Sequence, residues 1–107
     1  MISFLPFEEE NRVVFKAVDG ENEIGSCAIV SGGYEVEFVS VECDDDIITE
    51  GLARAAMNYA ANRMTYIAKI KKSIVKPAFI RLGFEGDEML SVEIPQALTS
   101  GCSCNHN

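Results

Sequence analysis

The chain has 107 residues, of which 48% are hydrophobic, and it carries a net charge of −8 with a pI near 4.5. This length predicts one domain with a modest core, and no apolar run approaches the roughly 18 residues that span a bilayer. An acidic chain of this kind is a poor partner for nucleic acid. Because the N-terminus lacks a basic segment, we expect no signal peptide and a cytoplasmic protein with free thiols.

The charge is distributed unevenly. Residues 1–50 hold 13 acids against Arg12 and Lys16, a net −11, whereas residues 51–107 hold seven bases against four acids, a net +3. No acid occurs between Gly51 and Phe84, where all seven of these bases lie. This stretch is either an anion site, for example for a phosphate group, or a surface that pairs with the acidic half of the chain.

Alternation and turn residues predict an N-terminal meander of strands. Residues 12–18 are rich in β-branched side chains, which indicates a strand. The turn signal at 19–22 leads into a second strand at 23–30, and a third strand at 34–41 becomes apolar on both faces, as a central strand does. A further strand or hydrophobic staple at 2–7 precedes them.

Helical spacing replaces the alternation after residue 46. Apolar residues recur every three or four positions over 47–63, and one of Asp44, Asp45 or Asp46 supplies the N-cap. The remaining predicted elements are a strand at 65–70, a helix at 73–82 capped by Ser73 with Pro77 in its first turn, and a strand at 89–94.

The resulting order, β-β-β-α-β-α-β, is an antiparallel meander followed by a crossover. It predicts an α+β fold with a mixed, mostly antiparallel sheet and two helices. Residues 1–95 form the predicted domain, and residues 96–107 a polar tail that contains cysteines.

The segment Lys76-Pro-Ala-Phe-Ile-Arg-Leu-Gly-Phe84 resembles the pattern A-x-x-F-Y-x-K-x-G-F near the end of GNAT-type N-acetyltransferases. Leu82-Gly83-Phe84 matches the closing residues, and Arg81 takes the basic position. Phe79 stands where the family has a tyrosine that often serves as general acid. With the element order, the resemblance covers residues 12–94 and implies a truncated GNAT-like fold that uses acetyl coenzyme A (acetyl-CoA).

The resemblance places the cofactor between the central strand and the next helix. There the family's glycine-containing loop binds the pyrophosphate through backbone N–H groups at a helix N-terminus. By position, the cofactor-binding residues would be Val39, Val41, Asp46, Ile47, Gly51 and Leu52. The loop here lacks the paired glycines and carries five acids that would repel a pyrophosphate, namely Glu42, Asp44, Asp45, Asp46 and Glu50.

Two further family features bear on catalysis. A glutamate on the central strand often serves the family as general base, so Glu35 and Glu37 are candidates, the alternative being a solvated strand face. The pair of helices that builds much of the family's acceptor pocket has no room in the four residues between strands 12–18 and 23–30.

The tail and the other cysteines allow a separate chemistry. Cys102, Cys104 and His106 have the ligand atoms for Zn²⁺ or another soft metal, but they could equally form a thiol pair or a frayed terminus. Cys27 is expected in the core, and Cys43 lies at the strand-to-helix loop, where a reactive thiol could lie.

These observations leave three hypotheses. The first is a diverged acyl-CoA-dependent N-acyltransferase that acts on a small-molecule amine or a protein acceptor. The second is a non-catalytic GNAT-like binding or assembly domain that has lost CoA binding, and its uncovered sheet surface predicts a homodimer. The third is a thiol or metal function of the C-terminal Cys-x-Cys.

Overall fold

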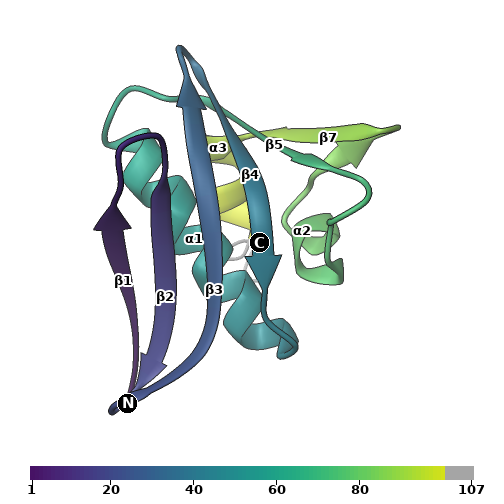
Figure 1. Cartoon of the computed structure of the whole chain (residues 1–107). Helices are drawn as coiled ribbons and strands as arrows, with labels where there is room; N and C mark the ends of the chain where they lie inside the picture. Colours follow the sequence, from purple (N-terminus) through teal and green to yellow (C-terminus); the bar gives the residue numbers. More distant parts are fainter. Residues whose placement is uncertain (101–107) are drawn as a thin grey trace.

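The structure, a computed structural model, describes residues 1–100. In this part of the chain seven strands form one sheet in the order β1-β2-β3-β4-β5-β7-β6, and three helices lie on one face of it (Figure 1). The elements are β1 (Ile2–Glu8), β2 (Val13–Asp19), β3 (Asn22–Gly32), β4 (Glu35–Glu42), α1 (Asp46–Ala61), β5 (Ile67–Lys71), α2 (Pro77–Arg81), β6 (Glu85–Gly86), β7 (Met89–Glu93) and α3 (Ile94–Ser100). Of the strand pairs within residues 1–100, only β4–β5 is parallel. The predicted α+β fold with a mostly antiparallel sheet is confirmed.

The helix α3 was not predicted, since sequence analysis gave two helices. It begins at Ile94 and runs to Ser100, across the boundary between residues 95 and 96 at which the predicted domain ends and the predicted polar tail begins. Ile94 and Ala97 are buried, and the Arg54 guanidinium of α1 donates a hydrogen bond to the Leu98 carbonyl at 3.3 Å. The spacing of Ile94, Ala97 and Leu98 is that of a helix with one apolar face, but the helix is too short for this pattern to stand out from a loop.

The second helix also starts later than predicted. Residues 72–74 form a turn rather than the start of a helix capped by Ser73, and α2 begins at Pro77 with Lys76 as its N-cap. Proline disfavours the helical conformation of the residue before it, so it sets the boundary at Lys76. Pro77 itself lies in the first turn, as expected, where its missing N–H group is not needed.

The N-terminal segment is a full strand, which changes the position of the first connection. β1 pairs with β2 from Ile2↔Asp19 to Glu8↔Val13. The first two strands are therefore β1 and β2, and the turn between them has only the four residues 9–12. A helix pair cannot be accommodated there, nor between β2 and β3.

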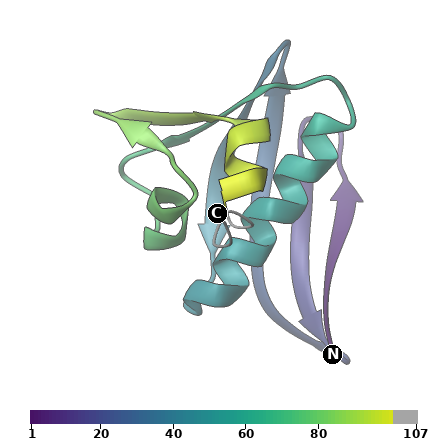
Figure 2. The ribbon, with the colours of Figure 1, turned by 180° about the vertical axis from the view of Figure 1, so that it is seen from behind.

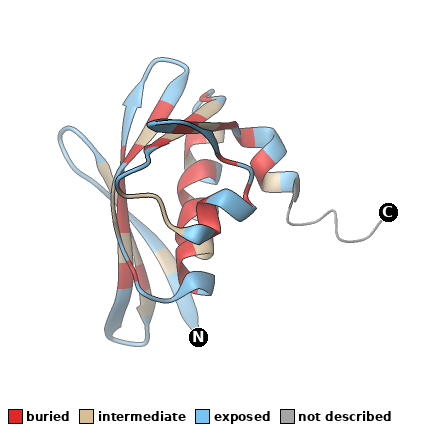
Figure 3. Cartoon of the chain, turned by 90° about the vertical axis from the view of Figure 1, so that its right-hand side faces the viewer, coloured by how far each residue is buried: buried red, intermediate tan, exposed pale blue. Residues whose placement is uncertain are grey.

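The core lies between the sheet and α1 (Figures 2 and 3). Ala53, Ala56 and Ala60 give α1 a small-residue face that is buried against the sheet. Near the N-terminus of the same helix, a Cβ at Gly51 would overlap the ring of Phe4 from β1. Gly51 therefore allows the edge strand to pack closely against the helix.

The opposite face of the sheet carries no helix from the described residues (Figure 3). Leu5 and Phe7 of β1, Val30 of β3 and Met89 of β7 remain 37–45% exposed. No helix within residues 1–100 is both long and apolar enough to cross a membrane.

The packing of Phe4 on Gly51 predicts the effect of a Gly51→Ala variant. The added methyl group must displace the ring, and overpacking typically costs about 1–3 kcal/mol, partly offset by about 1 kcal/mol of better helix propensity. We expect a net loss of up to about 2 kcal/mol of unfolding free energy in urea denaturation. Gly32→Ala, where a Cβ meets nothing within 4 Å, is the matched control, and equal stabilities of the two variants would contradict this packing.

Candidate functional site

The strands β4 and β5 separate in the middle of the sheet (Figure 1). They pair only from Glu35↔Ile67 to Phe38↔Ile70. The next residue, Val39, is an extra residue in the register with β3, since Ala28 pairs with Ser40 and Ile29 pairs with Phe38. Such a β-bulge bends its strand and increases the twist. From Val39 to Glu42, β3 is therefore the only strand that pairs with β4 among the described residues.

A cluster of three phenylalanines packs between the separating strands and α2. Phe38 of β4 meets Phe79 of α2 edge-to-face with ring centroids 5.0 Å apart, and Phe84 lies 5.3 Å from Phe79 and 6.2 Å from Phe38. All three side chains are almost completely buried. Phe79, which takes the position of the family's tyrosine, is therefore a core residue with no proton to donate.

The N-terminus of α1, next to the end of β4, is capped by its own carboxylate. The Ile48 N–H donates to Asp45 Oδ1 at 3.0 Å, and the Asp45 carbonyl accepts from the Thr49 N–H at 2.9 Å and from its hydroxyl at 2.8 Å. Asp44 and Asp46 on either side are exposed. The Ile48 N–H, which a bound anion would need as a donor, is thus already occupied by Asp45. The carboxylates of Asp44, Asp45 and Asp46 also place three negative charges at this helix end.

Arg81 of α2 connects to this acidic end of α1. Its guanidinium lies 2.6 Å from Asp46 Oδ2 and 3.0 Å from Glu50 Oε1, and Glu50 also pairs with Arg54 at 3.1 Å. The hydrogen bond from Arg81, followed by that from Arg54, lowers the pKa of Glu50. The same carboxylates raise the pKa of Arg81. These ion pairs tie α1 to α2 beside the separating strands.

The six predicted cofactor-binding residues fall into three groups. Val39 and Val41 lie on the stretch of β4 that β5 leaves, where backbone groups could hydrogen-bond the amides of an extended arm. Asp46 and the exposed Ile47 begin α1. Gly51 faces Phe4 and Leu52 is buried in the core. The open strand edge fits the arm of coenzyme A, but the acidic, self-capped α1 terminus does not fit its diphosphate.

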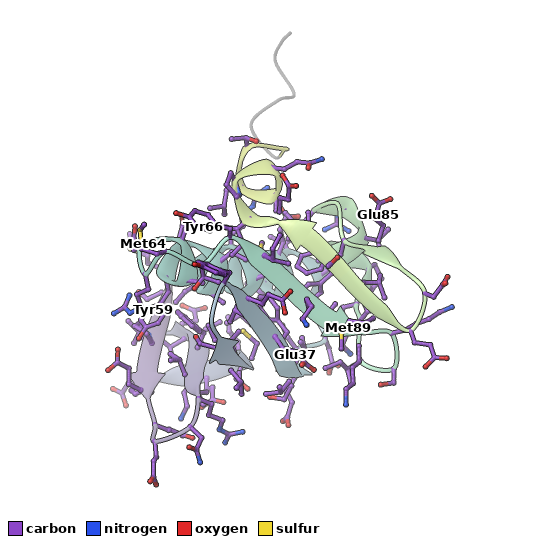
Figure 4. The ribbon with its side chains drawn as sticks, turned by 90° about the horizontal axis from the view of Figure 1, so that it is seen from above. Glu37, Tyr59, Met64, Tyr66, Glu85 and Met89 are labelled. Carbon is purple, nitrogen blue, oxygen red and sulfur yellow. The ribbon has the colours of Figure 1, made fainter. Side chains whose placement is uncertain are left out.

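The two candidate bases, Glu35 and Glu37, lie on the sheet face away from the helices, where Figure 4 labels Glu37. Lys69 of β5 pairs with Glu35 at 2.7 Å, and the pKa of Lys69 is raised, chiefly by Glu35 and to a smaller extent by Glu37. Both glutamates and Lys69 line a small cavity of about 140 Å³. Glu35 is therefore neutralised by a cation, which leaves Glu37 as the better candidate for a base.

The described cysteines show no metal site. Burial, with a smaller contribution from Cys43, raises the pKa of Cys27 to about 12, so its thiol is inert at neutral pH. The buried Cys43 thiol donates to the Asp45 carbonyl at 3.4 Å. Within residues 1–100, no three His, Cys, Asp or Glu side chains come together as metal ligands. Cys102, Cys104 and His106 lie outside the described residues.

A second charged cluster, which sequence analysis did not identify, lies at the other end of α1. The Tyr59 hydroxyl donates a hydrogen bond to Glu8, and Arg63 stacks 3.6 Å from the Tyr59 ring and 3.6 Å from Glu8. Glu8 and Tyr59 line a cavity of about 600 Å³ beside the β1–β2 turn. The helical spacing of Tyr59 and Arg63 was visible in the sequence, but their partner Glu8 is 51 residues away from Tyr59.

Comparison with solved structures identifies the architecture. No protein-family profile and no curated protein matches the chain by sequence. An aminoglycoside 6′-acetyltransferase type Ii is similar at a TM-score of 0.69 and 14% sequence identity, over 80% of this chain and 71% of that one. A probable acetyltransferase from Staphylococcus epidermidis ATCC 12228 is similar at a TM-score of 0.66 and 16% identity, over 78% of this chain and 68% of that one. The ribosomal-protein-S18-alanine N-acetyltransferase from Escherichia coli is similar at a TM-score of 0.67 and 11% identity, over 81% of this chain and 72% of that one. The chain has a GNAT-like fold.

The burial of Phe79 predicts that restoring the family's tyrosine destabilises the domain. The hydroxyl of a Phe79→Tyr variant would enter an aromatic cluster, and an unsatisfied buried polar group costs about 1–3 kcal/mol. We expect the unfolding free energy in urea to fall by that amount. Phe7→Tyr, at a residue 45% exposed, is the control and should be neutral. A Phe79→Tyr variant as stable as wild type would show that the hydroxyl finds a partner.

The Arg81 ion pairs predict a dependence of stability on pH. The pKa of Glu50 in the folded chain lies below its usual value of 4.5. The ionised Glu50 therefore contributes to the free energy of unfolding above pH 4.5, and this contribution is lost as the pH falls through the pKa of the folded chain. Arg81→Gln should therefore lower stability at pH 7, only slightly because such pairs are exposed, and by less at pH 2.5, where more of Glu50 is protonated. Urea titrations at both pH values test this, with Lys76→Gln as control. An equal loss at both pH values would exclude the ion pairs as its cause.

Proposed function

We propose that the chain is a diverged GNAT-like N-acyltransferase that uses the separation of β4 and β5 as its reaction cleft. The observation that supports this most is the β-bulge at Val39, after which β4 runs to Glu42 without β5 beside it. An extended acyl-thioester arm could add to that free edge by backbone hydrogen bonds. The acceptor would be a small-molecule amine or a protein amine, in the cytoplasm.

The residues of the chain would contribute positioning more than proton transfer. An acyl-CoA held by the free edge of β4 would supply the acyl group as an activated thioester. The free edge of β4 orients the donor, and the phenylalanine cluster keeps water from the inner side of the cleft. Glu37, two residues before the bulge, is the candidate to accept the proton of the amine.

The acidic α1 terminus favours a second candidate function. With the Asp45 cap in place and Asp46 paired to Arg81, this end of the helix disfavours the diphosphate that ordinary coenzyme A binding needs. The chain would then be a non-catalytic binding or assembly domain with this fold. Its uncovered sheet face, with Leu5, Phe7 and Val30, would support a homodimer, which sedimentation equilibrium tests.

Calorimetric titration of acetyl-CoA into the reduced, chelator-treated protein distinguishes the two functions. Acyl transfer requires saturable binding of acetyl-CoA. Because the carboxylates repel the diphosphate, the double variant Asp44→Asn with Asp46→Asn should lower the Kd for acetyl-CoA by about tenfold, which corresponds to roughly 1.4 kcal/mol of binding free energy. Acetyl-pantetheine, which lacks the diphosphate, should bind wild type and this variant equally.

The matched control is Glu9→Gln with Glu10→Gln, which removes the same charge at the β1–β2 turn near the opposite end of α1. The Kd of this control for acetyl-CoA should stay within about twofold of the wild-type value, since exposed charges beyond a Debye length of roughly 8 Å are screened. If neither donor binds wild type or the Asp44/Asp46 variant, the acyltransferase proposal fails and the non-catalytic domain remains.

A further inference from the structure

The bases of the acid-free stretch divide into two groups. Four have carboxylate partners, in the pairs Arg54–Glu50, Arg63–Glu8, Lys69–Glu35 and Arg81–Asp46. Lys71, Lys72 and Lys76 form no ion pair with any residue of the described part of the chain. All three lie at the connection from β5 to α2, so the cations that the fold leaves without a partner are concentrated in one place.

Two of these lysines line a cavity of about 650 Å³. Its walls are Lys71 at the end of β5, Lys72 and Ser73 in the turn that follows, Glu88 just before β7, and Met89 at the start of β7. The two segments are held together, because Lys71 pairs with Met89 in the sheet and the Lys72 N–H donates to the Glu88 carbonyl at 2.8 Å. The cavity is therefore built on strand ends whose positions backbone hydrogen bonds fix.

The cavity borders the proposed reaction cleft. Lys71 directly follows Ile70, the last residue of β5 that pairs with β4 before the strands separate. Met89 lies on the sheet face away from the helices, the same face as the candidate base Glu37 (Figure 4). A small molecule in this cavity would thus lie beside the end of β5 that leaves β4, where the proposed reaction needs an acceptor amine.

We propose that this cavity binds a small amine that also carries a phosphate group. Two ammonium groups and the Ser73 hydroxyl suit the dianionic phosphate, and the Glu88 carboxylate suits the ammonium group of the same molecule. Met89 provides an apolar surface for the short carbon chain between them. The lining carries two positive charges and one negative charge, which complements a ligand with two negative charges and one positive charge. The role of this molecule as acyl acceptor rests on the proposed function, but its binding does not.

The test is an NMR titration of the ¹⁵N-labelled full chain with phosphoethanolamine at constant ionic strength, without any acyl donor. We expect saturable shifts of the Ser73, Glu88 and Met89 amides. Lys72→Gln should weaken binding by about threefold or more, the effect of losing one charge–charge contact near the surface. Lys76→Gln removes the same charge from the same connection but not from the cavity, and should change the affinity much less. Absent shifts, or equal effects of the two variants, would overturn the site.

Inorganic phosphate is the second probe and tests the role of Glu88. Wild type should bind phosphoethanolamine more tightly than inorganic phosphate. Glu88→Gln should make the affinities for phosphoethanolamine and inorganic phosphate equal. The variant lacks the carboxylate that pairs with the ammonium group of phosphoethanolamine, and it also lacks the negative charge that repels inorganic phosphate. An unchanged preference would overturn the zwitterionic ligand. Binding of phosphoethanolamine here together with no binding of either acyl donor would leave the cavity assigned and contradict only the acyltransferase.

Discussion

The arrangement of this domain depends on one residue without a partner in the sheet, Val39. Because Ser40 and Phe38 pair with the consecutive residues Ala28 and Ile29 of β3, β4 bends at this point and leaves β5 after four paired residues. The gap on the helix side is then filled from α2, whose Phe79 packs against Phe38 and Phe84. A sheet with straight, fully paired β4 and β5 would offer neither an open edge to a ligand nor this position for α2.

Charge separation along the chain becomes charge pairing in the fold. The acidic N-terminal half and the basic stretch 51–84 meet through Glu8 and Arg63, Glu35 and Lys69, and Asp46 and Arg81. The interpretation as a pairing surface is therefore confirmed for four of the seven bases. The anion site stays a prediction, and it concerns the three lysines at the β5–α2 connection, which pair with no carboxylate within residues 1–100. Exposed pairs of this kind stabilise weakly, so they orient the helices more than they hold the domain together.

The fold is also shaped by what the short connections exclude. With four residues between β1 and β2, no helix from this connection covers the sheet, and one face carries no helix from residues 1–100 (Figure 3). A cavity lies beside this short β1–β2 turn, where the Tyr59 hydroxyl donates a hydrogen bond to Glu8. An acceptor or a second copy of the chain would therefore meet strands directly, and a sheet surface with half-exposed Leu5 and Phe7 is suited to such contact.

The sequence by itself determined the elements whose signals are local. β-Branched residues marked β2, the turn residues after it marked the start of β3, and alternation marked β4. Helical spacing marked α1, and Pro77 marked the first turn of α2. Each of these signals depends on residues within a few positions of one another. The closing Leu82-Gly83-Phe84 pointed to the fold as a whole. Short elements with weak patterns, such as α3 and β6, could not be recognised in this way.

Only the tertiary structure decided what these elements do together. The bulge at Val39 is a shift in the register between β3 and β4. The residue pattern of either strand alone does not predict it. The connection of α1 through Asp46 to Arg81 and the grouping of Lys71 and Lys72 with Glu88 depend on side chains that are far apart in the chain. A sequence gives the charges and their order, but whether two charges meet or one stays free is set by the distances that folding creates.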